Sequence, residues 1–328
     1  MGRPSCYDHI PLETGRTEKI LKSNLFSQII MDILILVEKF CNYLTSMKGY
    51  SPDTIRRYKG VVTHYCKMMN ISEISKVNDD NVREMFYVGR TQRKWSSNTF
   101  IVYHKTLKVF FRWCVKQGYL EKNPVDDIEK PRIEKKLPYK LTKQMALNLL
   151  ELVDNYPYGS NFLRYRNHAI FATFIFCGLR KQELLNLKYT DVDIENLTIF
   201  VRQGKGNKDR VVPMSYTLAQ TLKKYRNERK RLNITCPEFF ASSRENMGFT
   251  VNGLKKLIDQ VRLASGMKFS AHKLRHTFAT LMLEGGCDIY SLSKMMGHSD
   301  IKTTTIYLSA SADLLRSQMI KHPLNELV

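Results

Sequence analysis

The sequence predicts a mainly α-helical protein with a small β-sheet, divided into two domains. Apolar residues recur at steps of three and four along most of the chain, which is the spacing of a buried helical face. Strand-like segments occur only between residues 191 and 213. Residues 123–139 contain Pro124, Pro131 and Pro138 among many charged residues and lack that periodicity, so they are predicted to be an interdomain linker.

Residues 29–122 are predicted to form a small bundle of four helices. The first helix should bury the face that carries its apolar side chains, Ile33, Val37, Phe40, Cys41 and Leu44. It ends near Gly49, and Ser51 followed by Pro52 has the pattern of an N-cap and a first-turn proline for the second helix. Residues 1–28 are polar and mixed, and they are predicted to form an N-terminal arm or a disordered lead.

Residues 140–328 are predicted to form a mixed α/β domain. Helices are expected at residues 142–152, 164–177 and 181–187 and from residue 218 onward, and strands at 191–194, 197–202 and 210–213. The sequence shows no internal repeat and no low-complexity tract.

The chain carries a large excess of positive charge. Lys and Arg number 52 against 31 Asp and Glu, which gives a formal net charge of +21, and the pI is about 9.6. Such a charge favours a polyanionic partner, either nucleic acid or an anionic membrane. The longest apolar runs, residues 29–37 and 169–179, are far shorter than the roughly 20 residues of a membrane span, and residues 1–12 contain no signal-peptide core. We therefore expect a cytoplasmic protein that binds nucleic acid and has no membrane partner.

The cysteines and carboxylates predict neither a cofactor nor a catalytic metal. Seven cysteines are scattered without a CxxC pair or a matching spacing of histidines, which fits reduced, mostly buried thiols without zinc or disulfides. No cluster of Asp and Glu suits a two-metal site.

Four short segments of the second half carry groups that suit phosphate chemistry. In the first, Arg180 follows Gly178 at a junction of two predicted helices, close to backbone N–H groups that favour an anion. Taken alone, it is more simply interpreted as a surface arginine paired with Glu183. In the second, Lys205 lies in a Gly-rich turn between two predicted strands, and lysines of such hairpins are usually just solvated.

The third and fourth segments add histidines, an arginine and a tyrosine. His272 and Arg275 are three residues apart, so they share a helical face that can bind one phosphate, although this spacing is more often a plain helix surface. Gly297 ends a short predicted helix, and His298 follows it. Tyr307 is expected about two turns into the next helix, where most tyrosines are half-buried packing residues.

Together these segments have the order Arg, Lys, His-x-x-Arg, His, Tyr, and in this the sequence resembles the tyrosine recombinase, or phage integrase, family. The matching motifs are Gly-Leu-Arg at 178–180 with Glu183, Gly-Lys-Gly-Asn-Lys-Asp-Arg-Val-Val-Pro at 204–213, His-Lys-Leu-Arg-His at 272–276, Met-Gly-His at 296–298, and Tyr307. The resemblance covers about residues 140–320 and extends more loosely through the helical half. It implies an N-terminal SAM-like core-binding domain of helices and a C-terminal mixed α/β catalytic domain.

The resemblance implies a site-specific recombinase of the integrase or transposase type, acting on double-stranded DNA in a prokaryotic cytoplasm. Tyr307 would be the nucleophile that displaces a 5′-oxygen and leaves a 3′-phosphotyrosyl link, so that rejoining needs no ATP. Arg180 and Arg275 would hold the non-bridging phosphate oxygens. His272 and His298 would donate further hydrogen bonds or assist proton transfer.

Lys205 resembles the family's general acid, which protonates the departing 5′-oxygen. Lys208 in the same hairpin is the competing candidate. Glu183 is expected to orient Arg180 rather than to take part in the chemistry. The resemblance implies no metal ion and no nucleotide cofactor.

The resemblance also implies assembly on DNA. The protein would be a monomer when free and a homotetramer on two paired recombination sites, where it would exchange strands through a Holliday junction. The tail at residues 309–328 resembles the family's C-terminal helix that docks on a neighbouring protomer. Its apolar positions are Leu314, Leu315, Met319, Ile320 and Leu324. A helix that packs on its own domain explains these positions equally well.

Three other classes of DNA protein share parts of this pattern. A type IB topoisomerase uses the same tyrosine chemistry, but the motif Gly297-His298 and the compact hairpin at 204–209 favour a recombinase. Relaxation of plasmids without any specific site would favour the topoisomerase. A non-catalytic DNA-binding relative would have lost at least one of the six catalytic groups, and none is lost. A metal-dependent nuclease would need a carboxylate set that the sequence lacks.

Overall fold

The computed structural model describes residues 32–133, 140–202, 209–298, 300–305 and 307. The described residues fall into two compact units, one up to residue 133 and the other from residue 140 onward. Three predicted parts lie outside the described residues: the N-terminal arm at 1–28, the hairpin turn with Lys205 and Lys208, and the C-terminal tail at 309–328.

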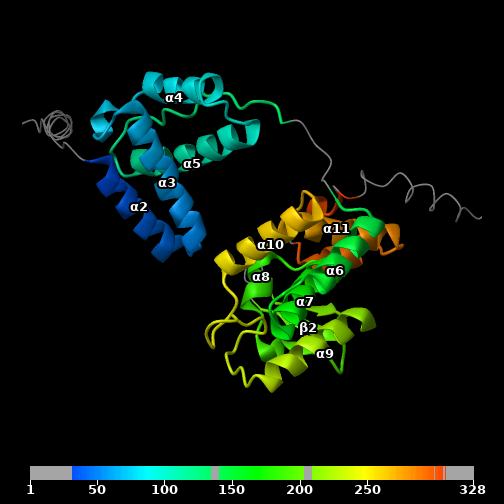
Figure 1. Ribbon diagram of the computed structural model, residues 1–328. Coiled ribbons are helices and arrows are strands. Elements are labelled where there is room, and N and C mark those ends of the chain that lie inside the picture. The colour runs from blue at the N-terminus through cyan, green and yellow to red at the C-terminus, as the bar shows by residue number, and fades with distance from the viewer. Residues whose placement is uncertain (1–31, 134–139, 203–208, 299, 306, 308–328) are drawn as a thin grey trace, which may run out of the picture. The chain divides into compact units, whose positions relative to one another are not determined.

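In its described residues, the first unit is a bundle of α-helices with one short 3-10 turn (Figure 1). Its elements are α2 (Ile33–Lys48), α3 (Pro52–Met69), η2 (Ile74–Lys76), α4 (Asp79–Thr91) and α5 (Ser97–Lys116). Gly49 closes α2 in the left-handed conformation with a φ of 61°, and Ser51 accepts a hydrogen bond from the backbone N–H of Thr54 to cap α3. The predicted four helices and the break at Gly49 are confirmed.

Aromatic side chains form much of the core of this bundle. Phe40 of α2 packs edge-to-face against Tyr58 of α3 and Phe110 of α5, with ring centroids 5.4 Å apart in both pairs. The predicted apolar face of α2 is buried, since its five residues are at most 4% exposed. The helical spacing of the sequence therefore identified the packed face correctly.

The segment predicted as a linker begins as part of this helical unit. Val125 is fully buried in the helical core. Asn123 donates a hydrogen bond to the Lys108 carbonyl oxygen over 3.0 Å, and His104 Nε2 lies 3.0 Å from the Ile128 carbonyl oxygen. Because burial of the valine side chain stabilises the segment that carries it, the folded unit extends past residue 122.

In its described residues, the second unit combines helices with a small antiparallel sheet (Figure 1). The helices and 3-10 turns are α6 (Lys143–Asn155), α7 (Asn161–Cys177), α8 (Lys181–Asn186), η3 (Tyr189–Asp191), α9 (Tyr216–Arg231), α10 (Val251–Ser265), α11 (Ala271–Glu284), α12 (Ile289–Met296) and η4 (Ile301–Thr303). The sheet has the order β1 (Val192–Asp193), β2 (Thr198–Val201), β3 (Arg210–Pro213). Val201 of β2 pairs with Arg210 of β3, so in the sequence this pair flanks the segment that contains Lys205.

The helix α7 lies inside the second unit. Its buried residues surround the helix rather than forming one stripe, which is the pattern of an interior helix. It packs against α6, α9 and α11. This packing fixes the point at which the chain leaves α7 and reaches Arg180.

The prediction of helix from residue 218 onward is wrong for residues 232–250, which are not helical. Arg229 at the end of α9 is 2% exposed and donates hydrogen bonds to backbone carbonyl oxygens of this segment. The acceptors are Cys236, Glu238 and Phe239. Phe239 and Phe240 are completely buried in the core. Burial of adjacent aromatic side chains and the hydrogen bonds to Arg229 together stabilise a non-helical path.

Candidate active site

Gly178 places the end of α7 directly against α11. Its φ is +58°, and a Cβ on this residue would lie 2.2 Å from Phe278 Cδ1, so only glycine fits here. Its carbonyl oxygen accepts a hydrogen bond from Arg275 over 2.7 Å. Arg180 follows as the N-cap residue of α8. The turn therefore brings an arginine of the α7–α8 junction close to an arginine of α11.

Glu183 on α8 joins two arginines in a buried ion-pair network. Its carboxylate accepts one hydrogen bond from the Arg180 guanidinium over 2.6 Å and two from Arg210 over 2.9 and 2.8 Å. The side chains of Arg210 and Glu183 are 9% and 5% exposed. Burial alone would raise the pKa of Glu183, but the hydrogen bonds and charge of Arg210, together with the bonds from Arg180, lower it to about 2. The ionised carboxylate thus holds both guanidinium groups.

Arg275 is a buried cation whose hydrogen-bond acceptors are mostly neutral. The residue is 3% exposed, and its guanidinium donates to the carbonyl oxygens of Gly178 and Met296 over 2.7 and 2.6 Å. It also lies 3.1 Å from His298 Nε2, and a carboxylate oxygen of Glu183 is 3.9 Å away. Burial and the neighbouring positive charges lower the pKa of Arg275 to about 10, so it remains charged at neutral pH.

The C-terminal end of α12 binds all three arginines. Three successive carbonyl oxygens each accept a hydrogen bond from a different guanidinium: Met295 from Arg210, Met296 from Arg275 and Gly297 from Arg180. The last carbonyl groups of a helix lack partners within it and carry the negative end of the helix dipole, so they suit cations. Gly297 has a φ of +63°, and a Cβ there would approach the Arg210 guanidinium to 3.0 Å. The positive φ and this close approach together favour glycine at this contact.

His298 connects the arginines to the segment that carries Tyr307. Its Nε2 faces Arg275, and its Nδ1 lies 2.8 Å from the Thr304 hydroxyl. Thr304 is completely buried, and the Asp300 side chain caps the turn η4. Both ring nitrogens of His298 are thus engaged, which fixes the orientation of the imidazole.

Tyr307 is packed inside the second unit, with 2% of its surface exposed. Its hydroxyl lies 2.7 Å from His276 Nδ1, and it belongs to an apolar cluster with Phe278 and Met296. Burial raises the pKa of Tyr307, and the charge of Arg275 opposes this rise. The tyrosine is therefore protonated at neutral pH.

The backbone before Tyr307 differs from the prediction of an α-helix. The described residues form the 3-10 turn η4, and Tyr307 donates its backbone N–H to the Thr304 carbonyl oxygen, three residues earlier, over 3.1 Å. Residues 303–305 are three consecutive threonines, and β-branched side chains have a reduced helix propensity. This local sequence and the contact of Thr304 with His298 favour the tighter turn.

His272 lies near the arginines and also contacts His276. Its ring meets the His276 ring edge-to-face, with centroids 4.3 Å apart. Desolvation, followed by the positive charges of Arg275 and Arg180, lowers the pKa of His272. The ring is consequently neutral at pH 7.

The described residues bring most of the predicted site together. Direct contacts, or contacts through one intermediate residue, link Arg180, His272, Arg275, His298 and Tyr307. Lys205 lies outside the described residues. Two members of the network, Arg210 and His276, are not among the predicted site residues. Both stand within the motifs that carry the family resemblance, so the signal in the sequence was their membership of those motifs.

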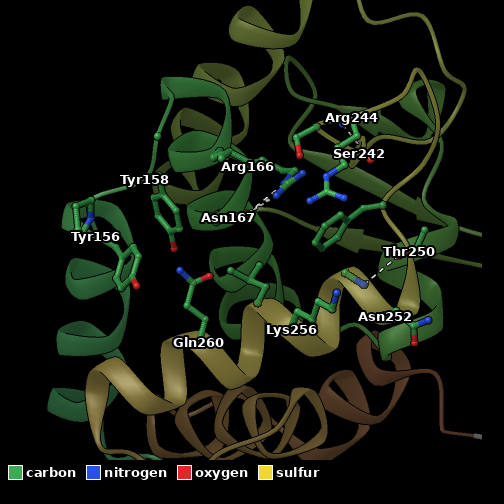
Figure 2. A pocket seen from close by; sticks show the side chains of 17 residues that line it. Tyr156, Tyr158, Arg166, Asn167, Ser242, Arg244, Thr250, Asn252, Lys256 and Gln260 are labelled. Carbon is green, nitrogen blue, oxygen red and sulfur yellow. Dashed lines mark hydrogen bonds between the residues drawn. The ribbon is translucent and has the colours of Figure 1, made fainter.

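A separate cavity of about 560 Å³ opens elsewhere on the second unit (Figure 2). Its wall contains Arg166, Arg244 and Lys256 and includes no Asp or Glu among the described residues. Arg166 is 5% exposed and donates hydrogen bonds to the Asn167 side chain and to the Ala241 carbonyl oxygen, both neutral. Such a wall carries a positive potential that suits an anion.

Within the described residues, no three His, Cys, Asp or Glu side chains are grouped so as to hold a metal ion. In the same part of the chain, no helix is long and apolar enough to cross a membrane. The described cysteines are free thiols, and all but the partly buried Cys287 are buried. The prediction of mostly buried thiols is confirmed for these cysteines.

Two family models match this sequence: "Phage integrase family" over residues 140–313 and "Phage integrase, N-terminal SAM-like domain" over residues 37–118. The first alone spans more than half of the chain. The protein belongs to the phage integrase family, and within it to the site-specific tyrosine recombinases. The predicted family, fold class and class of enzyme are confirmed.

Named relatives and solved structures are similar to most of this chain. Tyrosine recombinase XerC of Lactobacillus delbrueckii subsp. bulgaricus is 31% identical over 297 residues, which cover 88% of this chain and 99% of the relative. The crystal structure of XerH site-specific recombinase bound to difH substrate, a pre-cleavage complex, matches with a TM-score of 0.66 and 23% identity over 87% of this chain and 82% of that one. A lambda integrase tetramer bound to a Holliday junction matches with a TM-score of 0.67 and 16% identity over 88% of this chain and 80% of that one.

Proposed function

We propose that this recombinase cleaves and rejoins double-stranded DNA at specific sites through a covalent bond between Tyr307 and a 3′-phosphate. The observation that carries the proposal is the meeting of Arg180, Arg275, His298 and Tyr307 around the C-terminal end of α12. These residues come from distant parts of the sequence. A phosphate held by the arginines would lie beside a tyrosine hydroxyl, which is the arrangement that a covalent phosphoryl transfer needs.

In the proposed reaction, the Tyr307 oxygen attacks phosphorus as the bond from phosphorus to the 5′-oxygen breaks. Arg180 and Arg275 hold the two non-bridging oxygens, where negative charge concentrates. Three guanidinium groups surround the carboxylate of Glu183 in the described cluster, so positive charge remains in excess and attracts the phosphate. The new phosphotyrosyl bond conserves the energy of the phosphodiester, and the proposal includes neither ATP nor a metal ion.

Lys205 is the proposed general acid for the 5′-oxygen, with Lys208 as the alternative. Support comes from the base of the hairpin that carries these lysines. Arg210, the first residue of β3, donates hydrogen bonds to Glu183 and to the Met295 carbonyl oxygen, so one strand of the hairpin is anchored in the arginine cluster. His272 and His298 complete the proposed set of hydrogen-bond donors to the phosphate.

Basic cavities in the two units are the proposed contacts for DNA phosphates. In the first unit, a cavity of about 350 Å³ lies between α3 and α5, and its charged wall residues are Arg57, Lys105, Lys108 and Arg112. In the second unit, the cavity of Figure 2 presents Arg166, Arg244 and Lys256. Neither wall includes an acidic residue among those described, so binding to both should weaken steeply with salt.

The proposed assembly is a homotetramer on two paired DNA sites that exchanges strands through a Holliday junction. The lambda integrase tetramer on a Holliday junction, which shares the fold, supports this scheme. The free protein is proposed to be a monomer, because a net charge of +21 opposes self-association in the absence of DNA.

The substitution Tyr307→Phe tests the nucleophile. The phenylalanine ring fits the apolar cluster around Phe278 and Met296, so the variant should fold and bind DNA as the wild type does, while covalent adduct on a nicked suicide substrate falls to background. Gel shift measures the binding, and denaturing electrophoresis measures the adduct. Adduct at the wild-type level in the variant would show that another residue attacks the phosphate.

A further inference from the structure

We infer that His276 is the catalytic base that accepts the proton of Tyr307 as the tyrosine attacks phosphorus. The inference rests on the proposed function, because it names the acceptor for the proton that the proposed nucleophile must lose. It goes beyond the predicted site, in which His272 and His298 were the histidines expected to assist proton transfer and no residue was named as the acceptor of the Tyr307 proton.

The contact between His276 and Tyr307 has the geometry that proton transfer requires. The hydroxyl oxygen lies 2.7 Å from His276 Nδ1, within the reach of a general base. The two rings also pack together, with centroids 5.4 Å apart. His276 belongs to the regular helix α11, where its carbonyl oxygen accepts a hydrogen bond from the Thr280 hydroxyl. The base is therefore held on a rigid element.

Neither His298 nor His272 lies at the Tyr307 hydroxyl. The ring nitrogens of His298 face Arg275 and Thr304. His272 meets the His276 ring over a centroid distance of 4.3 Å, so it lies beside the base rather than at the hydroxyl. Both remain suited to bind the phosphate, as proposed above.

Burial and the neighbouring charges keep His276 neutral, as a base must be. The titratable and charged groups that face it are His272 and Arg275 on its own helix and Tyr307 opposite. Burial, and then the proximity of His272 and Arg275, lowers the pKa of His276 to about 4. The ring is neutral at pH 7, and with its proton on Nε2 its Nδ1 lone pair can accept from the tyrosine.

Binding of DNA should favour transfer of the proton from Tyr307 to His276. A phosphate held by Arg275 would offset the positive charge that opposes protonation of His276. At the same time, bond formation to phosphorus makes the Tyr307 hydroxyl far more acidic than it is in the free protein. The base therefore gains proton affinity when the nucleophile begins to lose its proton.

The bonds and protons of the proposed step balance. The O–H bond of Tyr307 breaks and an N–H bond forms at His276 Nδ1, while the bond from phosphorus to the tyrosine oxygen forms and the bond to the 5′-oxygen breaks. The 5′-oxygen takes its proton from Lys205. In rejoining, the 5′-hydroxyl returns a proton to Lys205, and His276 returns its proton to the departing Tyr307.

The variant His276→Asn separates hydrogen bonding from proton transfer. Its amide oxygen can accept the tyrosine hydrogen bond but cannot take the proton. We expect DNA binding to persist and the rate of adduct formation at pH 7.5 to fall by about 10²–10⁴-fold. The wild-type rate should stay nearly constant from pH 8 down to about pH 5, whereas the rate of the variant should rise about tenfold per pH unit, because only ionised tyrosine then attacks.

A substrate with a 5′-bridging phosphorothiolate identifies which proton transfer is lost. A thiolate leaves without a proton, so this substrate should rescue Lys205→Ala and should not rescue His276→Asn. The matched control is His168→Asn on α7, a histidine beside Asp154 in the same unit, and its cleavage rate should equal that of the wild type.

The results with the two variants distinguish failure of the inference from failure of the proposed function. Cleavage by His276→Asn at or above the wild-type rate, or its rescue by the phosphorothiolate, would overturn the inference and leave His276 as a residue that only holds Tyr307. Adduct formation by Tyr307→Phe would instead refute the proposed function itself. If His276→Asn fails to fold, His276→Ala is assayed with free imidazole, which should restore cleavage if a base is missing and have no effect otherwise.

Discussion

Glu183 is the acidic residue around which the arginines of the site are arranged. Two guanidinium groups share its carboxylate, and a third lies 3.9 Å away. Removal of one member of a buried ion pair leaves a charge without compensation, and this costs about 3–5 kcal/mol in typical proteins. The carboxylate therefore stabilises the second unit and also keeps Arg180 in the orientation proposed for phosphate binding.

The substitution Glu183→Gln should lower the free energy of unfolding of the second unit by about 3 kcal/mol at pH 7, a value that follows from the fall of the Glu183 pKa from 4.5 to about 2. Because the folded-state pKa is lowered, this stabilisation is complete above about pH 5 and is lost as the pH falls towards 2. Urea unfolding followed by circular dichroism at several pH values measures the difference, which should narrow below pH 4.5.

The matched control for this substitution is Glu195→Gln in the same unit. Glu195 pairs with Arg226, but its side chain is 75% exposed, and surface pairs of this kind contribute little. We expect a change within about 0.5 kcal/mol at every pH. A gap between wild type and Glu183→Gln that stays constant down to pH 3 would contradict the role given to the Glu183 charge.

At the scale of the elements, the arginines are positioned mainly by the ends of helices. The carbonyl group that ends α7 at Gly178 and the three that end α12 all accept hydrogen bonds from arginines. Both helix ends use a glycine with positive φ, which turns the chain without a Cβ and leaves the carbonyl groups accessible. The geometry of the site therefore depends on where two helices stop.

The substitution Gly178→Ala should destabilise the second unit by more than about 2 kcal/mol. The left-handed conformation alone costs an alanine roughly 1–2 kcal/mol. In addition, the new Cβ would lie 2.2 Å from the buried ring of Phe278. Gly266→Ala separates the two effects, since Gly266 has a φ of +67° with nothing within 4 Å of the new Cβ. It should show the backbone cost alone. Thermal unfolding measures both variants, and equal losses would mean that Phe278 moves aside freely.

The sequence correctly predicted helices and caps that depend on neighbouring residues. It missed features that depend on contacts between residues far apart in the sequence. The spacing of apolar residues in α2 and the cap at Ser51 are local, and both were found. The non-helical path of residues 232–250 depends on hydrogen bonds to Arg229. The tight turn before Tyr307 depends on the contact of Thr304 with His298. Neither contact leaves a periodic pattern that the sequence alone displays.

The same distinction applies to the site. The order and type of its residues identified the family and five residues that the structure brings together. The partnership of His276 with Tyr307 joins residues 31 positions apart, and the ion pair of Arg210 with Glu183 joins residues 27 apart. These two contacts form only when α11 and the sheet fold against the segments that carry the partner residues, so the sequence alone does not reveal them.

At the scale of the whole molecule, we expect the net charge to oppose self-association until DNA is bound. The net charge of +21 makes free protomers repel one another, with a range of about 8 Å at physiological ionic strength. DNA phosphates neutralise this charge. Contacts between protomers that are too weak for the free protein can therefore form when two sites bring protomers together.

The C-terminal tail, residues 309–328, is the segment whose role in assembly can be tested by deletion. We expect the free full-length protein to be a monomer and to form a tetramer on two paired sites. If the apolar positions Leu314, Leu315, Met319 and Ile320 dock on a neighbouring protomer, deletion of residues 312–328 should spare binding to a single site, weaken cooperative occupation of neighbouring sites and alter cleavage. Gel shift measures the first two effects and light scattering measures the assembly. A truncated protein that is unfolded would instead show that the tail packs on its own unit, and docking on a neighbouring protomer would then be wrong.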